Sequence, residues 1–188
     1  MTMARATETA VVVPVPAAEP VVAGHRRRLD VAASWGVGAH VSVLYPFAPP
    51  SVVDDALIAR LDAALRVVPA FDCAFERCEW FGDDVLWLAP EPAQPFRALT
   101  TAVWREFPEY PPYGGAHDDP VPHLTVGESR RGTRADLERA EAEVSPQLPV
   151  RTHIDRVVLL AGTSEPDSWR PVRHFALRPQ TWCRASPS

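Results

Sequence analysis

The stretch His40-Val41-Ser42-Val43-Leu44-Tyr45-Pro46-Phe47 predicts a β-strand from His40 to Leu44, because apolar and polar residues alternate along it. Successive side chains on a strand point to opposite faces. His40 and Ser42 therefore share one face, and Val41 and Val43 share the other. We expect the valine face to anchor the strand in a core and the imidazole and hydroxyl to border a cleft.

A second stretch, His123-Leu124-Thr125-Val126, repeats the same pattern further along the chain. By the same alternation, the imidazole and the hydroxyl lie on one face and two apolar side chains lie on the other. A hydroxyl two residues after a histidine often arises by chance. The argument therefore depends on the surroundings of the two stretches and not on the tripeptides alone.

The surroundings of the two stretches predict a similar series of elements. We expect a strand at 9–15, a short helix at 18–30, a helix from a capping box at Ser51–Asp54 to Pro69, a hairpin of 71–79 and 85–89, a helix at 95–107, a helix opened by a capping box at Thr133–Asp136, and a closing hairpin of 154–160 and 174–177.

Both halves of the chain have the order strand, helix, His-x-Ser/Thr strand, capped helix, strand. This order indicates an internal duplication and predicts an α+β fold in which two pseudo-symmetric lobes face each other around a cleft. For 188 residues with 46% hydrophobic content, we expect a single bilobal domain over residues 1–188, with loose ends at about 1–7 and 180–188.

Composition excludes several classes of enzyme. All 19 residues counted as lysine or arginine are arginine. Without lysine the chain lacks a Schiff-base or pyridoxal phosphate lysine, a P-loop lysine and a lysyl-nucleotide intermediate. P-loop NTPases, protein kinases and ATP-dependent nucleic-acid ligases are thereby excluded.

Charge and cysteine content bear on partners and compartment. A net charge of −5 and a pI near 5.7 argue against binding to extended duplex nucleic acid. The three cysteines have no Cys-x-x-Cys spacing, so they indicate neither a disulfide framework nor a zinc site, and they suit the reducing cytoplasm. No apolar run approaches the ~18 residues of a membrane span. We expect a cytoplasmic monomer with no membrane partner.

The two polar faces together provide the groups that phosphodiester hydrolysis needs. One neutral histidine of the pair His40 and His123 takes a proton from water, and the other, protonated, gives one to the leaving oxygen. Ser42 and Thr125 donate hydrogen bonds to the non-bridging phosphate oxygens. No metal is required, and near-symmetry leaves open which histidine is the acid.

The stretches 40–47 and 123–126 resemble the paired motifs of the 2H phosphoesterases, a superfamily that includes 2′-5′ RNA ligase-like proteins and cyclic phosphodiesterases. The resemblance implies a two-lobed fold with two antiparallel sheets flanking a central cleft and helices outside. It also implies activity on 2′,3′-cyclic phosphates or 2′-5′ linkages of RNA ends or small nucleotides. Both histidines would be catalytic and both hydroxyls phosphate-binding, with no metal and no cofactor.

The chain departs from this family beside the second motif. Many relatives carry an arginine shortly after it, where this chain has Gly127-Glu128 before Arg130. A glutamate near a phosphate repels it unless the carboxylate points away. Arg130 is a candidate for substrate binding.

Several aromatic and charged residues have two interpretations. Tyr45, Phe47 and Trp35 either stack on a base or pack in the core, and they are candidate substrate-binding residues. The run Arg26–Arg28 is a solvated helix face or a guide for a phosphorylated substrate. The other tryptophans are interpreted as packing residues: Trp80, Trp87, Trp104, Trp169 and Trp182.

Alternatives remain for both the site and the function. His117-Asp118-Asp119 with His123 is a weaker candidate for a metal cluster, and a Ser42 triad lacks a Gly-x-Ser-x-Gly elbow. His25, His153 and His174 receive no role. As functions, a non-catalytic module that binds nucleotides or RNA ends, and a hydrolase of a non-nucleotide phosphodiester, stand beside the cyclic phosphodiesterase.

Overall fold

The computed structural model describes residues 6–115 and 121–179. Its strands are β1 (Glu8–Pro14), β2 (His40–Leu44), β3 (Phe71–Phe81), β4 (Val85–Glu91), β5 (Leu124–Glu128), β6 (Val150–Ile154), β7 (Arg156–Gly162) and β8 (Arg170–Ala176). Its helices are α1 (Glu19–Leu29), α2 (Val31–Ser34), α3 (Asp55–Leu65), α4 (Gln94–Glu106) and α5 (Arg134–Val144). Among these elements, α2 and β6 have no counterpart in the sequence prediction.

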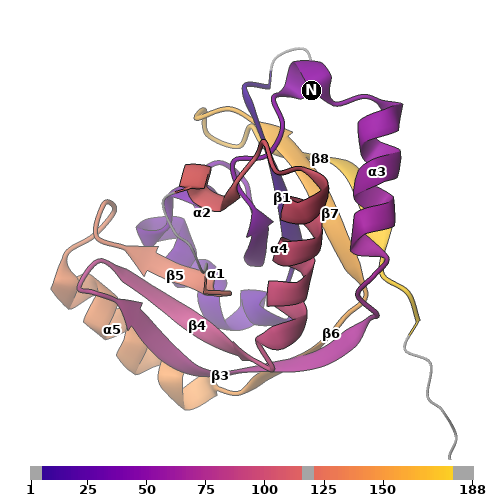
Figure 1. The fold of residues 1–188 in the computed structure, drawn as a ribbon. Helices are drawn as coiled ribbons and strands as arrows, with labels where there is room; N and C mark the ends of the chain where they lie inside the picture. The colour runs from indigo at the N-terminus through magenta and orange to yellow at the C-terminus, as the bar shows by residue number, and fades with distance from the viewer. Residues whose placement is uncertain (1–5, 116–120, 180–188) are drawn as a thin grey trace, which may run out of the picture.

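The described strands form two antiparallel sheets of four strands each (Figure 1). Their orders are β2-β1-β7-β8 and β5-β4-β3-β6. The two His-x-Ser/Thr strands, β2 and β5, are edge strands of different sheets. The predicted α+β fold with two antiparallel sheets is thus confirmed.

The two sheets do not correspond to consecutive halves of the chain. β1 pairs with β2 along one edge and with β7 along the other, where Val11 faces Leu159. The closing hairpin of β7 and β8 therefore returns to the sheet of the first motif, while β6 joins the second sheet beside β3. The expectation of two sequential lobes is wrong in this respect, because long-range pairing of β1 decides which sheet the last strands complete.

The position of β1 inside its sheet accounts for the run of apolar residues in its sequence. Val11 and Val13 are fully buried in the main core, whereas Ala10 and Val12 belong to a second apolar cluster on the opposite face with Trp169. A strand covered on both faces does not alternate between apolar and polar residues. β1 therefore has apolar side chains on both faces.

Each lobe sends one helix to the motif strand of the other. α1, which follows β1, packs against β5, and α4, which follows β4, packs against β2. Leu29 at the end of α1 lies so close to Gly127 that a Cβ on the glycine would be 2.7 Å from the Leu29 Cβ. On the other side, Thr100 of α4 donates a hydrogen bond of 3.0 Å to the carbonyl of Val43. The helices thus cross between the lobes.

Both motif strands contain a bulge at the same place. In β2, Ser42 pairs with Val12 and Leu44 with Val11, so Val43 has no partner. In β5, Thr125 pairs with Trp87 and Gly127 with Leu86, so Val126 has no partner. An extra residue shifts the alternation by one position. The third residue after each hydroxyl residue, Tyr45 or Glu128, consequently lies on the polar face.

The two predicted capping boxes have different outcomes. Thr133 caps α5, with its hydroxyl accepting from the Asp136 amide and the Asp136 carboxylate accepting from the Thr133 amide, as predicted. Ser51 does not cap α3, because it lies in the 3-10 turn Pro50–Val52. The cap is Asp54, whose carboxylate accepts from the Leu57 amide at 2.8 Å. A carboxylate at the N-cap also interacts favourably with the helix dipole.

The close approach of α1 to β5 predicts the effect of Gly127→Ala. The new Cβ would also be 2.8 Å from Leu137 Cδ2, so the core must shift, and overpacking of this kind costs about 1–3 kcal/mol. Gly24→Ala is the control, because Gly24 is exposed in α1 with nothing within 4 Å of an added Cβ; it should stabilise by about 0.5–1 kcal/mol. Urea denaturation measures both, and equal stability of the two variants would contradict the contact.

Candidate active site

The two motifs meet in one cleft between the sheets. His40 and Ser42 of the first motif and His123 and Thr125 of the second all line this cleft, which has a volume of about 680 Å³. That volume is in the range of small-molecule sites. The structure therefore brings together the four residues that the sequence selects for catalysis and phosphate binding.

The rest of the cleft is mostly apolar. Its lining comes from both sheets and from the segment that joins α1 to β2: Ala10, Val12, Asp30, Val31, Ala32, Trp35, Val37, Tyr45, Phe81, Val85, Val121, Glu128, Arg130, Leu160 and Trp169. Only Asp30, Glu128 and Arg130 in this set carry a formal charge at neutral pH. The cleft thus offers a few polar groups within an apolar wall, as small-ligand sites commonly do.

Both histidines are held by the same local hydrogen bond. Nδ1 of His40 lies 2.8 Å from the carbonyl oxygen of Gly38, and Nδ1 of His123 lies 2.8 Å from that of Val121. A carbonyl can only accept, so Nδ1 carries the proton in each ring. The Nε2 atom of each neutral imidazole is then left with a lone pair for proton transfer.

Burial shifts the titration of both imidazoles. Desolvation lowers the pKa of His40 to about 3, with a further lowering by Arg26 and His123 and a raising by the Gly38 carbonyl. Desolvation also lowers the pKa of His123, while the Val121 carbonyl and Asp30 raise it. The ring of His123 lies edge-on to Phe81, at 5.0 Å between centroids. The two similar motifs therefore have different electrostatic surroundings.

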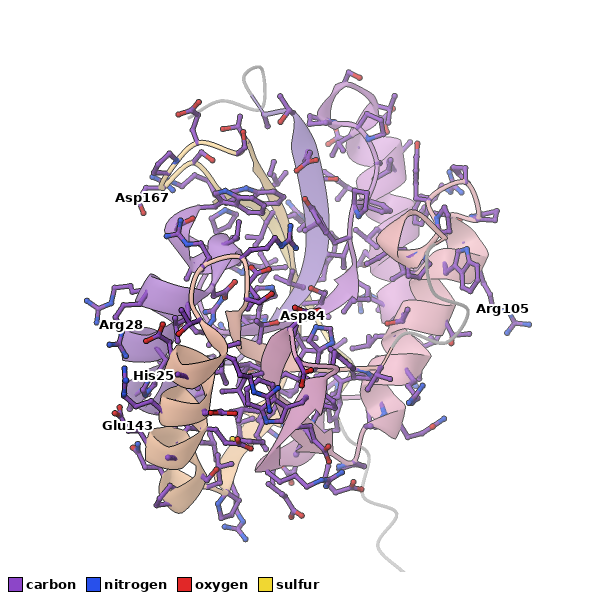
Figure 2. All side chains as sticks on the ribbon, turned by 90° about the vertical axis from the view of Figure 1, so that its left-hand side faces the viewer. His25, Arg28, Asp84, Arg105, Glu143 and Asp167 are labelled. Carbon is purple, nitrogen blue, oxygen red and sulfur yellow. The ribbon has the colours of Figure 1, made fainter. Side chains whose placement is uncertain are left out.

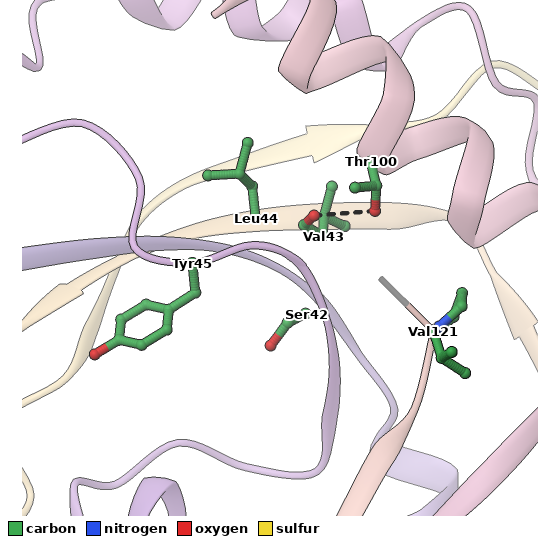
Figure 3. A pocket seen from close by; sticks show the side chains of 7 residues that line it. Ser42, Val43, Leu44, Tyr45, Thr100 and Val121 are labelled. Carbon is green, nitrogen blue, oxygen red and sulfur yellow. Dashed lines mark hydrogen bonds between the residues drawn. The ribbon is translucent and has the colours of Figure 1, made fainter. Parts of the chain in front are cut away.

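The two hydroxyls are available to a ligand. Ser42 and Thr125 are half-buried, and neither hydroxyl has a hydrogen-bond partner among the residues that the structure describes. In Figure 3, Ser42 and Tyr45 project to one side of β2 and Leu44 to the other. Beside Ser42, a hollow of about 10 Å³ has room for about one water molecule. Two unpaired donors facing the cleft suit the oxygens of a phosphate.

The bulges place Tyr45 and Glu128 at equivalent positions in the cleft. The Tyr45 hydroxyl donates to the Glu8 carboxylate at 2.9 Å. The Glu128 carboxylate accepts from the Val31 amide at 3.0 Å and from Arg130 Nε at 2.9 Å. Glu128 therefore lies in the cleft with both oxygens occupied, which reduces the repulsion of a phosphate that its position would otherwise cause.

The predicted substrate-binding aromatics are separated by the fold. Trp35 and Tyr45 line the cleft, whereas Phe47 is buried in the core, edge-on to Phe107 at 5.2 Å. Trp169, interpreted from the sequence as a packing residue, also lines the cleft and stacks on Trp35 at 6.0 Å with an interplanar angle of 16°. No signal in the sequence points to Trp169, because its hairpin approaches the site only through the pairing of β7 with β1.

The prediction of a solvated face for the arginine run of α1 holds for two of its three residues. Arg27 and Arg28 are exposed, but Arg26 is buried and forms an ion pair with Asp30 at 2.7 Å. His25, which received no role, lies with Arg28 and Glu143 on the outer flank of the molecule (Figure 2), where its Nε2 is 3.6 Å from a Glu143 carboxylate oxygen. The sequence shows the i,i+4 spacing of Arg26 and Asp30 but not the tertiary packing that buries them, so the burial of Arg26 is missed.

The described residues contain no group of three or more histidine, cysteine, aspartate or glutamate side chains arranged to hold a metal ion. The segment His117-Asp118-Asp119, considered above for a metal cluster, lies outside the described residues, as does Trp182. Within the described ranges, no helix has the length and apolarity needed to cross a membrane.

Comparison with solved structures finds the same fold in proteins of low sequence identity. A Thermus thermophilus protein aligns with a TM-score of 0.62 at 16% identity, covering 93% of this chain and 100% of its own. A structure described as a phosphoesterase aligns with a TM-score of 0.59 at 14% identity, with coverages of 93% and 99%. E. coli LigT complexed with 3′-AMP aligns with a TM-score of 0.57 at 13% identity, with coverages of 92% and 99%.

Sequence comparison identifies the family. No curated protein matches the chain. A family model described as the 2′-5′ RNA ligase superfamily matches residues 13–165, which is more than half of the chain and includes both motifs. With the paired His-x-Ser/Thr strands, their shared cleft and the LigT-like fold, this match establishes that the chain belongs to the 2′-5′ RNA ligase superfamily, whose members are 2H phosphoesterases.

Proposed function

We propose that this protein is a metal-independent phosphoesterase that hydrolyses 2′,3′-cyclic phosphates, or reversibly cleaves 2′-5′ linkages, on RNA ends or small nucleotides. The observation that carries the proposal is the convergence of His40, His123, Ser42 and Thr125 on one cleft. Membership of the superfamily supports phosphodiester chemistry of this kind.

The mechanism follows from the orientation of the two rings. Each Nδ1 is bound to a backbone carbonyl, so proton transfer takes place at Nε2. One neutral imidazole removes the proton from the attacking water while the other, protonated, gives its proton to the leaving oxygen. Ser42 and Thr125 donate to the non-bridging oxygens, where negative charge increases in the transition state.

A nucleoside fits the apolar part of the cleft. Trp35 and Trp169 form a stacked pair at its wall, and aromatic side chains commonly bind bases by stacking. E. coli LigT has been solved with 3′-AMP, with ATP and with NADP+, which supports a nucleotide as the substrate. Arg130 reaches the cleft with its guanidinium held at Nε by Glu128 and is proposed to bind the substrate through its remaining donors.

A second candidate is a hydrolase of a non-nucleotide phosphodiester. The cleft lining contains two carboxylates, Asp30 and Glu128, and one arginine, so it does not favour a long polyanion. A non-catalytic module that binds nucleotides or RNA ends would have the same cleft. Assays on a panel of small phosphodiesters, with calorimetry for binding, separate the three functions.

Replacing either histidine should abolish most of the activity. We expect His40→Ala and His123→Ala each to lower kcat on a nucleoside 2′,3′-cyclic phosphate by about 10²–10⁴-fold, the usual contribution of a general acid or base. EDTA should leave the parent unchanged. His174→Ala on the exposed face of β8 is the control. Full activity in both variants, or loss of the parent's activity in EDTA, would refute the proposal, and tight binding without turnover would favour the binding module.

Removing the hydroxyls should slow the chemical step. Ser42→Ala and Thr125→Val each delete one donor to the transition-state oxyanion, and the loss of one such donor costs on the order of 10²-fold in kcat. Steady-state kinetics should show a smaller change in KM than in kcat. A change confined to KM would instead assign the hydroxyls to ground-state binding.

The lowered pKa values predict an acidic optimum. The imidazole that acts as the acid must be protonated, and the pKa of each ring lies below the usual 6.5. Protonation, and with it kcat/KM, should therefore increase as the pH falls below 6.5. The rate should fall again as the pH approaches about 3, where His40 also gains a proton. A pH profile of kcat/KM measures this, and an optimum above pH 8 would contradict it.

A further inference from the structure

One buried ion pair beneath the cleft belongs to neither motif. Arg26 and Asp30, at the end of α1, are each 3% exposed in their side chains. Nε of Arg26 donates to Asp30 Oδ2 at 2.9 Å, and Nη2 lies 2.7 Å from the same oxygen. Apolar residues of similar volume often stabilise a core as well as a buried ion pair does. Stability alone therefore does not account for a buried ion pair at this place.

The pair is connected to both histidines. Nη2 of Arg26 also donates to the Val37 carbonyl at 3.2 Å, and the next residue, Gly38, provides the carbonyl that holds His40. Asp30 lines the cleft together with His123, and its Oδ1 accepts from the Ala32 amide at 2.9 Å. Arg26 is thus linked through Val37 and Gly38 to His40, and Asp30 lines the cleft that both imidazoles border.

The other half of the molecule has no such pair at the matching positions. Asp30 is the C-cap of α1, and its amide donates to the Arg26 carbonyl; Phe107 is the C-cap of α4, and its amide donates to the Val103 carbonyl. Val103 and Phe107 are both fully buried and apolar. The two helices occupy equivalent places in the fold, since each packs against the motif strand of the other sheet. The Arg26–Asp30 pair therefore breaks the near-symmetry of the site.

We propose that the Arg26–Asp30 pair assigns the roles of the two histidines, making His40 the general base and His123 the general acid in the hydrolytic direction. Arg26 and Asp30 act through the imidazoles and are positioning residues. The assignment rests on the proposed phosphodiester hydrolysis, whereas the electrostatic effect of the pair does not.

The charges around each ring agree with this assignment. Arg26 and His123 disfavour a proton on His40, and Asp30 favours one on His123. Two other charged side chains of the cleft lining, Glu128 and Arg130, are bound to each other, and Glu19, near His40 in the chain fold, accepts from the Ala39 amide at 2.6 Å. Between the two imidazoles, His123 is therefore the one that keeps a proton more readily.

The proposed step balances for a cyclic phosphate. His40 Nε2 takes a proton from water as the water oxygen forms a bond to phosphorus. The bond from phosphorus to one ribose oxygen breaks, and that oxygen receives the proton of His123 Nε2. One water is added, a phosphomonoester is formed, and exchange with solvent restores both imidazoles.

A leaving-group experiment tests the roles. Hydrolysis of a 4-nitrophenyl phosphodiester releases 4-nitrophenolate. This leaving group is a stable anion, so its departure needs no proton from a general acid. We expect His123→Ala to lower kcat by about 10²-fold or more on the cyclic nucleotide but by less than about tenfold on the nitrophenyl ester. His40→Ala should lower kcat on both substrates, because both need a base to activate water. The opposite pattern would overturn the assignment. If the parent turns over neither substrate, the proposed function fails.

The effect of the ion pair is measured without turnover. In the double variant Arg26→Met/Asp30→Leu, NMR titration should show the pKa of His40 raised and that of His123 lowered relative to the parent. Arg27→Met, which removes an exposed charge from the same helix, is the control and should leave both unchanged. If the double variant does not fold, Asp30→Asn, whose Oδ1 can still accept from Ala32, should lower the pKa of His123. Unchanged titrations would refute the role of the pair.

Discussion

The packing of each connecting helix against the motif strand of the opposite sheet is the constraint that creates the site. An edge strand is bonded to one neighbour only, so its position is set largely by what covers its face. Leu29 of α1 lies against Gly127 in β5, and Thr100 of α4 bonds the carbonyl of Val43, the bulged residue of β2. These contacts lie at or beside the bulged residues Val43 and Val126 and hold two strands of different sheets at one cleft.

The bulges then determine which side chains face the cleft. A regular strand would place Tyr45 and Glu128 on the core face, opposite the histidines. One extra residue in each strand returns both side chains to the cleft. There the Tyr45 hydroxyl donates to Glu8 of β1, and the Glu128 carboxylate accepts from the Val31 amide of α2. The same bond to a backbone carbonyl in both motifs fixes the proton on Nδ1 and leaves the lone pair of each neutral imidazole on Nε2.

Pseudo-symmetry provides two similar imidazoles, but the proposed hydrolysis needs one of them as a base and the other as an acid. The differences come from residues outside the motifs. Arg26 and Asp30 occupy positions that in α4 are held by Val103 and Phe107, and a stacked Trp35–Trp169 pair lines the cleft beside the first sheet. Unequal surroundings thus make a proton less favourable on His40, beside Arg26, than on His123, beside Asp30, although the two side chains are chemically identical.

Features that depend on neighbours a few residues away can be predicted from the amino-acid sequence alone. Alternation in 40–44 and 123–126 revealed the strands and their polar faces, and Thr133–Asp136 revealed a helix start, because strand alternation and capping bonds are local. Long-range packing, in contrast, was needed to show that β7 and β8 join the first sheet, that Trp169 reaches the cleft, that Phe47 enters the core and that other segments cover the Arg26–Asp30 pair. Each of these depends on contacts between segments whose proximity no local pattern encodes.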